Sequence, residues 1–395
     1  MGKVLPLGGN YAVAYAVKAC DVDVITAYPI SPQTTIVERL SEFVANGELN
    51  AEFLHVESEH SALSVAIGAA AVGARTYSAT CSQGLALMNE LLYIMSYVRL
   101  PMVLTIVNRA LSAPINIWND HSDFMSVNDA GWIMMMSASN QEAYDEILLG
   151  YRIAEDPRVL LPVITSMDGY IQSHVVEPVE IVSDEEAISF APKRRSWVTL
   201  NPDKPVTMGP VGDPNYYFEF RRQLWEAMKE SRKVFDEATE EFAKRFGRKY
   251  SAIETYMLED AEVAIVGMGS FMGTIKAFVD RARRDGVKVG ALRVKLYRPF
   301  PSEDIARALS NVKLVGVMDR ALMPGSAAGG HLHHEVAFAL RQAGLETKTI
   351  GFIAGLGGRL LTIDNVKQMV NVLINYKDKP VRELPKEPIF IGVRE

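Results

Sequence analysis

The chain has 395 residues, of which 48% are hydrophobic and 23% are charged. This length and composition predict a globular protein of two or three domains. The formal net charge is -7 and acidic and basic residues are interspersed, which argues against nucleic acid or an anionic membrane as partner. Neither a signal-peptide pattern nor an apolar stretch of about 20 residues occurs, so we expect a cytoplasmic protein.

Only two cysteines occur, Cys20 and Cys81. They are too few for a disulfide framework, for a four-cysteine zinc site or for an iron-sulfur cluster. Cys81 follows a strand-like run and could lie near a site, but a small buried side chain is the simpler interpretation. Any iron-sulfur cluster that works with this protein must therefore belong to another chain.

Apolar strand-like runs alternate with helical stretches through the first half of the chain. This alternation predicts a parallel sheet that helices cover on both faces, as in doubly wound α/β proteins. The predicted strands span residues 22–27, 53–56, 76–80, 102–107, 133–136 and 160–165.

Two of the predicted helices differ in character. The one after Pro32 carries its apolar residues on one stripe and ends at Gly47, which is typical of a helix covering a sheet. The one from His60 to Ala74 consists mostly of small apolar residues, so we expect it to be buried nearly all round. A charged residue at its start, Glu59, is then conspicuous.

The second half begins with a Pro-, Asp- and Lys-rich stretch at 182–215, which we interpret as a linker. A long charged helix is predicted over 218–248 and is followed by a second alternating unit, a smaller α/β domain. Its predicted strands span 263–267, 289–294, 313–317 and 347–352. We divide the chain into a first domain with its linker, 1–235, and a second domain, 236–395.

Polar side chains stand where the predicted strands end. Residues 28–32 read Tyr-Pro-Ile-Ser-Pro, and Glu59 follows the next strand. Because ligands of parallel sheets bind outside the carboxyl ends of the strands, these groups are candidate site residues. The stretch from Arg109 to Gly131 has no period and is rich in polar and aromatic residues, as a loop covering a site would be.

Short motifs occur along the whole chain in a definite order. They are Gly9-Asn10, the Tyr-Pro-Ile-Ser-Pro turn, Ser58-Glu59, Ser82-Gln83-Gly84-Leu85, Asn108-Arg109-Ala110-Leu111, Asn119-Asp120-His121-Ser122-Asp123, Asp168-Gly169, Ser173-His174 and Tyr297-Arg298-Pro299-Phe300-Pro301. In order and spacing, this set resembles the α chain of the 2-oxoacid:ferredoxin oxidoreductases, the pyruvate enzyme above all. The resemblance covers essentially the whole chain and implies a thiamine diphosphate pyrimidine-binding domain followed by a domain like the C-terminal domain of transketolase.

This resemblance implies roles for particular residues. Glu59 resembles the carboxyl group that hydrogen-bonds the aminopyrimidine of thiamine diphosphate, so that the cofactor can lose its C2 proton. Two alternatives stay open: Glu59 could merely cap its helix, and Glu57 lies on the same side of the strand. The other residues that we expect to contact the cofactor are Tyr28, Pro29, Ser82 and Gln83.

The substrate contacts follow from the same resemblance. Arg109 would clamp the carboxylate of the 2-oxoacid with its guanidinium fork, and Asn108 would assist. Alternatively, Arg109 could pair with Asp120 or Asp123 for structural reasons. Ser31 would donate its hydroxyl to the substrate. The family more often has threonine there, so serine leaves room for a slightly larger acid.

The chain lacks a Gly-Asp-Gly motif with a following asparagine, which thiamine enzymes use to hold Mg²⁺ and the diphosphate. Half of the cofactor site must then come from another chain. The resemblance implies a β subunit carrying Mg²⁺, the diphosphate and a cluster, a γ subunit, and a ferredoxin-like δ subunit with further clusters. The complex would convert pyruvate and coenzyme A into acetyl-CoA and CO2 and pass electrons to ferredoxin.

Several alternatives remain open at this stage. Within the family, branched-chain, 2-oxoglutarate and oxalate versions exist; the oxalate version places an arginine where Ser31 stands. Further hypotheses are a split thiamine-dependent decarboxylase, a scaffold subunit and an NAD-dependent dehydrogenase. The last arises from the glycine-rich stretch at 267–273, which resembles a dinucleotide-binding motif. His331, His334 and Glu335 share one helix face and suggest either metal ligands or, more simply, a polar surface.

Overall fold

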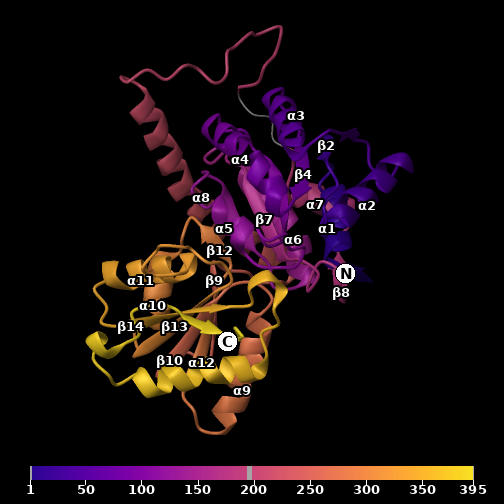
Figure 1. Ribbon diagram of the computed structural model, residues 1–395. Helices are drawn as coiled ribbons and strands as arrows, with labels where there is room; N and C mark the ends of the chain where they lie inside the picture. Colours follow the sequence, from indigo (N-terminus) through magenta and orange to yellow (C-terminus); the bar gives the residue numbers. More distant parts are fainter. Residues whose placement is uncertain (1, 194–197, 395) are drawn as a thin grey trace.

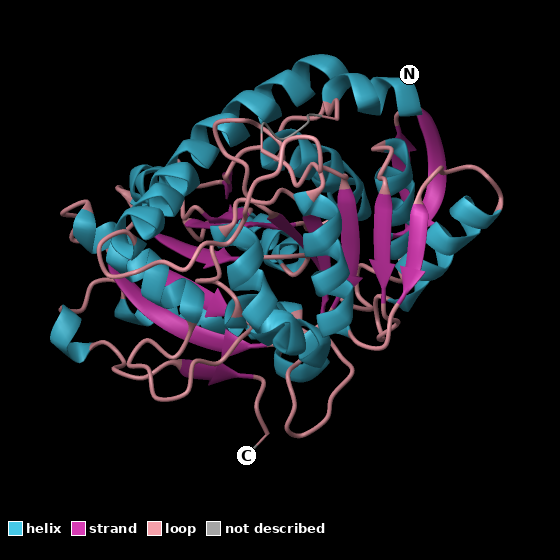
Figure 2. Cartoon of the chain, turned by 90° about the horizontal axis from the view of Figure 1, so that it is seen from above, coloured by secondary structure: helices cyan, strands magenta, loops and turns pink. Residues whose placement is uncertain are grey.

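Two mixed β-sheets organise the chain, which a computed structural model describes over residues 2–193 and 198–394. In Figure 1 the first sheet and its helices run mostly from indigo to magenta, with β12 in orange, and the second sheet with its helices runs from orange to yellow next to them. Figure 2 shows both sheets flanked by helices. The predicted pair of α/β units is confirmed.

The first sheet has seven strands in the order β12-β6-β7-β5-β4-β2-β3. All neighbours pair in parallel except β12, which runs antiparallel to β6. Every strand predicted in the first half of the chain is present. The strands are β2 (Val24–Ala27), β3 (Glu52–His55), β4 (Thr76–Thr80), β5 (Val103–Asn108), β6 (Ile133–Met136), β7 (Val163–Asp168) and β12 (Leu296–Arg298).

Both faces of this sheet are covered, as the continuous apolar runs of its strands require. Along β5, Val103 and Val107 point into one core, whereas Leu104 and Ile106 point into the other. The first core is shared with α1 (Gly9–Ala19), α2 (Thr34–Ala45), α6 (Asn140–Ala154) and α8 (Tyr217–Phe246). The second core contains α3 (Glu59–Ala71) and α4 (Ser82–Tyr97) and continues into the second unit.

The expectation that the helix after Glu59 is buried all round is wrong for this chain. Ala62, Ala66 and Ala70 of α3 face the core. On the other side Ser64 and Gly68 are exposed, and Val72 just after the helix is 59% exposed. Small apolar side chains predict close packing, but they do not reveal whether the covering surface belongs to the same chain.

The second sheet has six strands in the order β15-β14-β13-β10-β11-β9, with only β9 antiparallel to its neighbour. Its strands are β9 (Ile253–Tyr256), β10 (Val263–Gly267), β11 (Val289–Val294), β13 (Leu314–Asp319), β14 (Lys348–Ala354) and β15 (Ile389–Ile391). The helical elements around it are α9 (Met272–Arg284), α10 (Ser302–Leu309), α11 (His331–Gln342), η1 (Leu356–Gly358), α12 (Ile363–Tyr376) and η2 (Val381–Glu383).

Some elements were not predicted. β1 (Lys3–Gly8) pairs antiparallel with β8 (Val176–Ile181) outside both large sheets. The predicted linker contains α7 (Asp184–Phe190), which begins at a capping box of Ser183 and Glu186, a signal readable from the sequence. α5 (Ser122–Ser126) interrupts the predicted loop.

The division of the chain at residue 235 stays a prediction. That boundary lies inside α8, and β12, which follows the second unit's β11, pairs with the first sheet. Among the described residues no helix is long and apolar enough to cross a membrane.

Candidate functional site

The turn after β2 and the ends of β4 and β5 meet at the carboxyl edge of the first sheet. The guanidinium of Arg109, directly after β5, donates from Nη1 to the carbonyl oxygen of Ser31 at 3.0 Å. The Cys81 thiol, directly after β4, donates to the same oxygen at 3.1 Å. Three segments distant in sequence thus converge on one carbonyl, as parallel strand ends do.

A second contact, made by the Asp123 carboxylate, holds the residues after β4 and β5 together. The Asp123 carboxylate accepts hydrogen bonds from the backbone N–H groups of Ser82 and Arg109, both at 2.9 Å. It is fully buried, and burial raises its pKa to about 6 against the opposing effect of these bonds. Asp123 belongs to one of the family-like motifs, but no local sequence pattern indicates this supporting role.

Glu59 is the first residue of α3 and is only 6% exposed, whereas Glu57 is exposed. The helix is capped by Ser58, whose hydroxyl accepts from the N–H of Ser61 at 3.1 Å. No other residue in the described parts of the chain forms a hydrogen bond or ion pair with the Glu59 carboxylate. The capping function therefore falls to Ser58, and Glu59 keeps a buried carboxylate available for a ligand.

The first turn of α4 lies directly against that carboxylate. A Cβ atom placed on Gly84 would stand 2.6 Å from Oε1 of Glu59 and 2.5 Å from Oγ1 of Thr80. Only glycine leaves the room that the carboxylate occupies. The charges of Glu59 and Arg109 both reach Cys81: burial mainly raises the pKa of this thiol, Glu59 adds to the rise and Arg109 opposes it. Glu59 contacts the first turn of α4, and Arg109 shares the Ser31 carbonyl with Cys81, the residue before α4, so both lie near the same strand end.

The structural alternative for Arg109 is not observed. Its side chain is 8% exposed, and within the described ranges its guanidinium forms no ion pair. Asp123 binds only its backbone, and the Asp120 carboxylate is engaged by Ser122 and by the N–H of Gly357. The cation is held by carbonyl oxygens, which leave its charge unneutralised and suited to an anionic ligand.

The other expected cofactor contacts lie around the same strand ends. Tyr28 is half-buried and Pro29 is exposed in the turn after β2, whose peptide between Ser31 and Pro32 is cis. The Ser82 hydroxyl lies 2.6 Å from the carbonyl oxygen of Ala110 and 2.5 Å from Oε1 of Gln83. This hydroxyl is thus used within the protein.

Asn108 does not face the site as expected. Its side chain is fully buried, its Nδ2 donates to Asp123 at 3.0 Å, and its Oδ1 accepts from the Ser166 hydroxyl at 2.7 Å. Because both polar atoms are engaged inside the protein, Asn108 supports Asp123 instead of contacting substrate.

A buried cluster centred on Asp168, at the end of β7, joins the two units beside the site. Its carboxylate binds His121 at 2.9 Å and Arg320 at 2.8 Å, and it also accepts from Asn119 and Ser270. Burial alone would raise the pKa of Asp168, but the Arg320 charge and these hydrogen bonds hold it well below its usual range. Sequence reasoning missed this contact.

The same cluster accounts for the glycine-rich turn after β10. Ser270 and the left-handed Gly269 close that turn onto Asp168, so it serves the contact between the units. On α11, Glu335 pairs with Arg298 at 2.6 Å. In the described part of the chain no group of three His, Cys, Asp or Glu side chains is placed to hold a metal ion.

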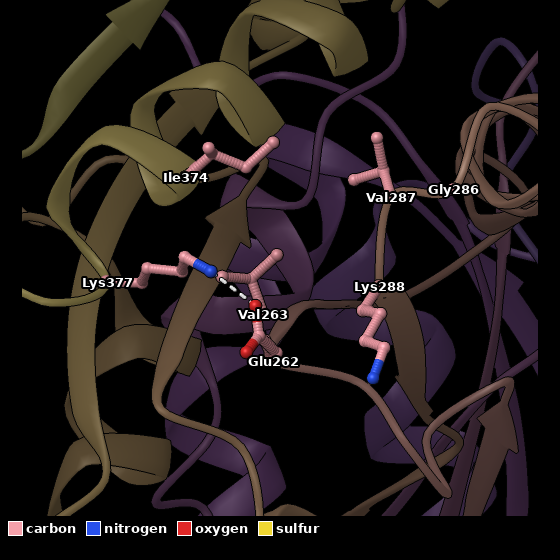
Figure 3. A pocket seen from close by; sticks show the side chains of 7 residues that line it. All are labelled: Glu262, Val263, Gly286, Val287, Lys288, Ile374 and Lys377. Carbon is pink, nitrogen blue, oxygen red and sulfur yellow. Dashed lines mark hydrogen bonds and ion pairs between the residues drawn. The ribbon is translucent and has the colours of Figure 1, made fainter.

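A pocket of about 380 Å³ lies at the opposite edge of the second sheet, where β10 and β11 begin (Figure 3). Glu262, one of its lining residues, forms ion pairs with Lys377 and Lys313. Because ligands of parallel sheets bind at the other edge, we do not assign the site to this pocket.

Comparison with known proteins identifies the family. Residues 15–240 match the family described as "Pyruvate flavodoxin/ferredoxin oxidoreductase, thiamine diP-bdg", and residues 261–366 match "Pyruvate:ferredoxin oxidoreductase core domain II". The chain belongs to the pyruvate:ferredoxin oxidoreductase family. It is a subunit of a multi-subunit oxidoreductase and contains that family's thiamine diphosphate-binding domain.

Curated relatives agree along the full length. Pyruvate synthase subunit PorA of Methanocaldococcus jannaschii is 49% identical over 100% of this chain and 99% of its own. The PorA subunit of Pyrococcus furiosus is 47% identical over 98% of this chain and 96% of its own. Ketoisovalerate oxidoreductase subunit VorA of Pyrococcus horikoshii is 42% identical over 91% of each.

Solved structures support the fold. The 2-oxoglutarate:ferredoxin oxidoreductase from Magnetococcus marinus superposes with a TM-score of 0.73 at 20% identity, over 94% of this chain and 65% of that chain. A split-gene transketolase superposes with a TM-score of 0.55 at 12% identity, over 94% of this chain and 100% of its own. The predicted likeness to transketolase is confirmed for the fold.

Proposed function

We propose that this subunit binds the aminopyrimidine half of thiamine diphosphate and the 2-oxoacid, and that the acid is pyruvate. The assembled enzyme would convert pyruvate and coenzyme A into acetyl-CoA and CO2, with electrons passing to ferredoxin. The observation that carries this proposal is the buried Glu59 carboxylate, which has no hydrogen-bond or ion-pair partner among the described residues, near the same strand ends as the unneutralised Arg109 guanidinium.

The residues fit the cofactor. When bound, thiamine diphosphate supplies a carbanion at C2 that adds to the ketone of a 2-oxoacid. Glu59 would hold a proton between its carboxyl oxygen and the pyrimidine nitrogen, and its burial removes water that would compete for that bond. Gly84 supports this role, because the absence of its Cβ leaves the carboxylate its place. Tyr28, Pro29 and Gln83 would line the ring.

The substrate would lie between Arg109 and Ser31. Nε and Nη1 of Arg109 are held by the carbonyl oxygens of Asn116 and Ser31, which fixes the plane of the guanidinium. A fixed fork can hold the substrate carboxylate in one orientation while the adjacent carbon-carbon bond breaks. The Ser31 hydroxyl, in an exposed residue at the edge of the site, would donate to the substrate.

The rest of the cofactor site would come from a partner subunit. Among the described residues, exposed apolar side chains stand at the end of α3, where Val72 is 59% exposed, and on α4, where Leu87 is 51% exposed. Exposed apolar faces next to an incomplete site are typical of subunit contacts. We assign Mg²⁺ and the diphosphate to a β subunit, and iron-sulfur clusters to the β and δ subunits. A γ subunit would complete the complex. A place in the cytoplasm stays a prediction.

The identity of the 2-oxoacid substrate is the most specific part of the proposal. Several relatives at 43 to 49% identity are pyruvate synthase subunits, whereas the ketoisovalerate relative is 42% identical. This difference favours pyruvate. Ser31 favours a site with slightly more room than one with threonine, so 2-oxoisovalerate is the specific competitor to test.

The test is CoA-dependent viologen reduction by the anaerobically purified complex, with pyruvate, 2-oxoisovalerate, 2-oxoglutarate and oxalate as substrates. We expect pyruvate to be the preferred acid and Glu59→Gln to reduce kcat by about 10²- to 10⁴-fold. The exposed Glu57→Gln is the matched control and should leave the rate unchanged.

Other outcomes would revise the proposal in distinct ways. Preference for the branched acid would change the substrate alone. CO2 release without CoA-dependent reduction, from a complex that retains clusters and cofactor, would point to a split decarboxylase. Full activity of Glu59→Gln would overturn the role of this carboxyl group.

A further inference from the structure

The loop that carries Arg109 is held by a turn of the second unit. This glycine turn, residues 355–358, directly follows β14 at the carboxyl edge of the second sheet. The N–H of Gly357 donates to the Asp120 carboxylate at 3.0 Å, and its carbonyl oxygen accepts from Nδ2 of Asn116 at 3.2 Å. Gly357 of the second unit thus binds the loop at two points, and it does so through its backbone atoms alone.

The sequence of the turn suits this close approach. Gly357 and Gly358 both have positive φ, 57° and 85°. A Cβ on Gly357 would lie 2.6 Å from Nδ2 of Asn116, and one on Gly358 would lie 2.4 Å from Cβ of Trp118. The N–H of Gly358 also donates to the carbonyl oxygen of Asn119 at 2.6 Å. Glycine is required both for the backbone conformation and for the contact.

Asn116 transmits this contact to the guanidinium. Its carbonyl oxygen accepts from Nε of Arg109 at 3.0 Å, while its side-chain Oδ1 accepts from the N–H of Trp118 at 2.6 Å. The carbonyl of Trp118 in turn accepts from the N–H of Ala110. The neighbours Ile115 and Ile117 are exposed, so the tip of the loop, residues 115–117, has little packing of its own. The conformation of residues 115–117 therefore depends mainly on the hydrogen bonds of Asn116.

We infer that the glycine turn of the second unit, acting through Asn116, positions the Arg109 guanidinium for the substrate carboxylate. Asn116 and Gly357 are positioning residues and touch no substrate. A bidentate clamp works only while its plane is fixed, so a loosened tip weakens the hold on the acid. The inference rests on the proposed function, in which Arg109 holds the substrate.

The test compares variants of the purified complex in CoA-dependent pyruvate oxidation. Asn116→Ser keeps a short acceptor for the N–H of Trp118 but cannot reach Gly357, and Gly357→Ala pushes a methyl group against Asn116. We expect each to raise KM for pyruvate about 5- to 10-fold, the equivalent of one lost hydrogen bond, with kcat within about 3-fold. Thiamine diphosphate affinity should not change.

Gly344→Ala is the matched control. Gly344 has a φ of 72° but no atom within 4 Å of its missing Cβ, so this variant imposes the same backbone strain away from the loop. It should leave KM unchanged. Asn116→Ser adds no side chain to a positive-φ glycine, so it carries the test even where Gly357→Ala impairs folding.

A double-variant cycle separates this inference from the proposed function. Arg109→Lys should raise KM by itself, and adding Asn116→Ser should then have little further effect, because both act through the same guanidinium. If Arg109→Lys leaves KM for pyruvate unchanged, the proposed substrate role of Arg109 is wrong. If Arg109→Lys raises KM but Asn116→Ser does not, or if their effects multiply independently, the positioning role is overturned.

Discussion

The Asp123 carboxylate accepts a hydrogen bond of 2.9 Å from the backbone N–H of Arg109. The same oxygen accepts from the N–H of Ser82, while the other oxygen accepts from Nδ2 of Asn108 and from the N–H of Phe124. One buried carboxylate therefore ties together the residues that follow β4 and β5, Ser82 and Arg109. Its position decides where the proposed substrate and cofactor contacts stand relative to each other.

Replacing this carboxylate should damage both stability and activity. In Asp123→Asn an amide nitrogen takes the place of one oxygen and faces two N–H donors, so those donors lose their acceptor. We expect the free energy of unfolding to fall by about 2–4 kcal/mol, and activity to fall with it. Denaturant unfolding of the full chain measures the first quantity and turnover of the complex the second.

Asp129→Asn is the control for that prediction. Asp129 is exposed and accepts one hydrogen bond, from the Tyr93 hydroxyl at 2.6 Å. Its replacement should cost less than about 1 kcal/mol and leave activity intact. Equal losses in the two variants would show that Asp123 has no special supporting role.

Gly84→Ala should affect the cofactor site more than the fold. The added methyl group would stand 2.6 Å from Oε1 of Glu59 and 2.5 Å from Oγ1 of Thr80, so the carboxylate must move. We expect thiamine diphosphate affinity to fall by about 10-fold or more, measured by titrating the cofactor-free complex and following activity. Alanine is otherwise favoured over glycine within a helix, so the thermal stability should change little.

The helix effect is measured separately with Gly273→Ala. Gly273 lies in α9 and its missing Cβ has nothing within 4 Å. This variant should leave the cofactor affinity as it is. An unchanged affinity in Gly84→Ala as well would argue that Glu59 does not need its present position.

Much of the fold was readable from the sequence because buried parallel strands are continuous apolar runs. β4, β6, β10 and β11 have the predicted bounds. The choice between Glu57 and Glu59 could not be made from strand alternation, which puts both on one side; it depends on the packing of α4 against α3. The same holds for Asn108, whose burial depends on a carboxylate from a later helix.

Contacts between the two units were beyond sequence reasoning. Asp168 and Arg320 lie far apart in the chain, and nothing in their local patterns links them. The hydrogen bonds of Gly357 with Asn116 and Asp120 likewise arise from the packing of the two units. Local patterns determine strands and helices, whereas these side-chain pairings arise only once the two sheets have been packed together.

Ser31→Thr should narrow the substrate range. The added methyl group keeps the hydroxyl donor and takes up space beside the proposed acyl group. We expect the ratio of kcat/KM for pyruvate to that for 2-oxoisovalerate to rise by roughly 10-fold, in the range typical of one methyl group in a pocket. Competition assays with both acids measure this ratio directly. Ser31→Ala, which removes the donor without adding bulk, should lower kcat/KM for both acids alike.

Asp168→Asn should weaken the contact between the two units in a pH-dependent way. Its carboxylate neutralises Arg320, which is almost completely buried, so the variant leaves an unpaired buried cation. We expect the free energy of unfolding at pH 7 to fall by about 3–5 kcal/mol. Asp236→Asn, which affects only an exposed ion pair with Arg232, is the control and should cost less than about 1 kcal/mol.

The pH profile follows from the lowered pKa of Asp168 in the folded state. Below the ordinary aspartate pKa of about 3.9 the unfolded chain binds a proton that the folded chain does not, so the stability from this carboxylate is lost as pH falls. The difference between wild type and Asp168→Asn should therefore be constant from pH 7 to about 5 and shrink below about 4. Urea unfolding across this range measures it. A difference that instead grows on acidification would show that Asp168 is protonated in the folded chain and that its pairing with Arg320 is not ionic.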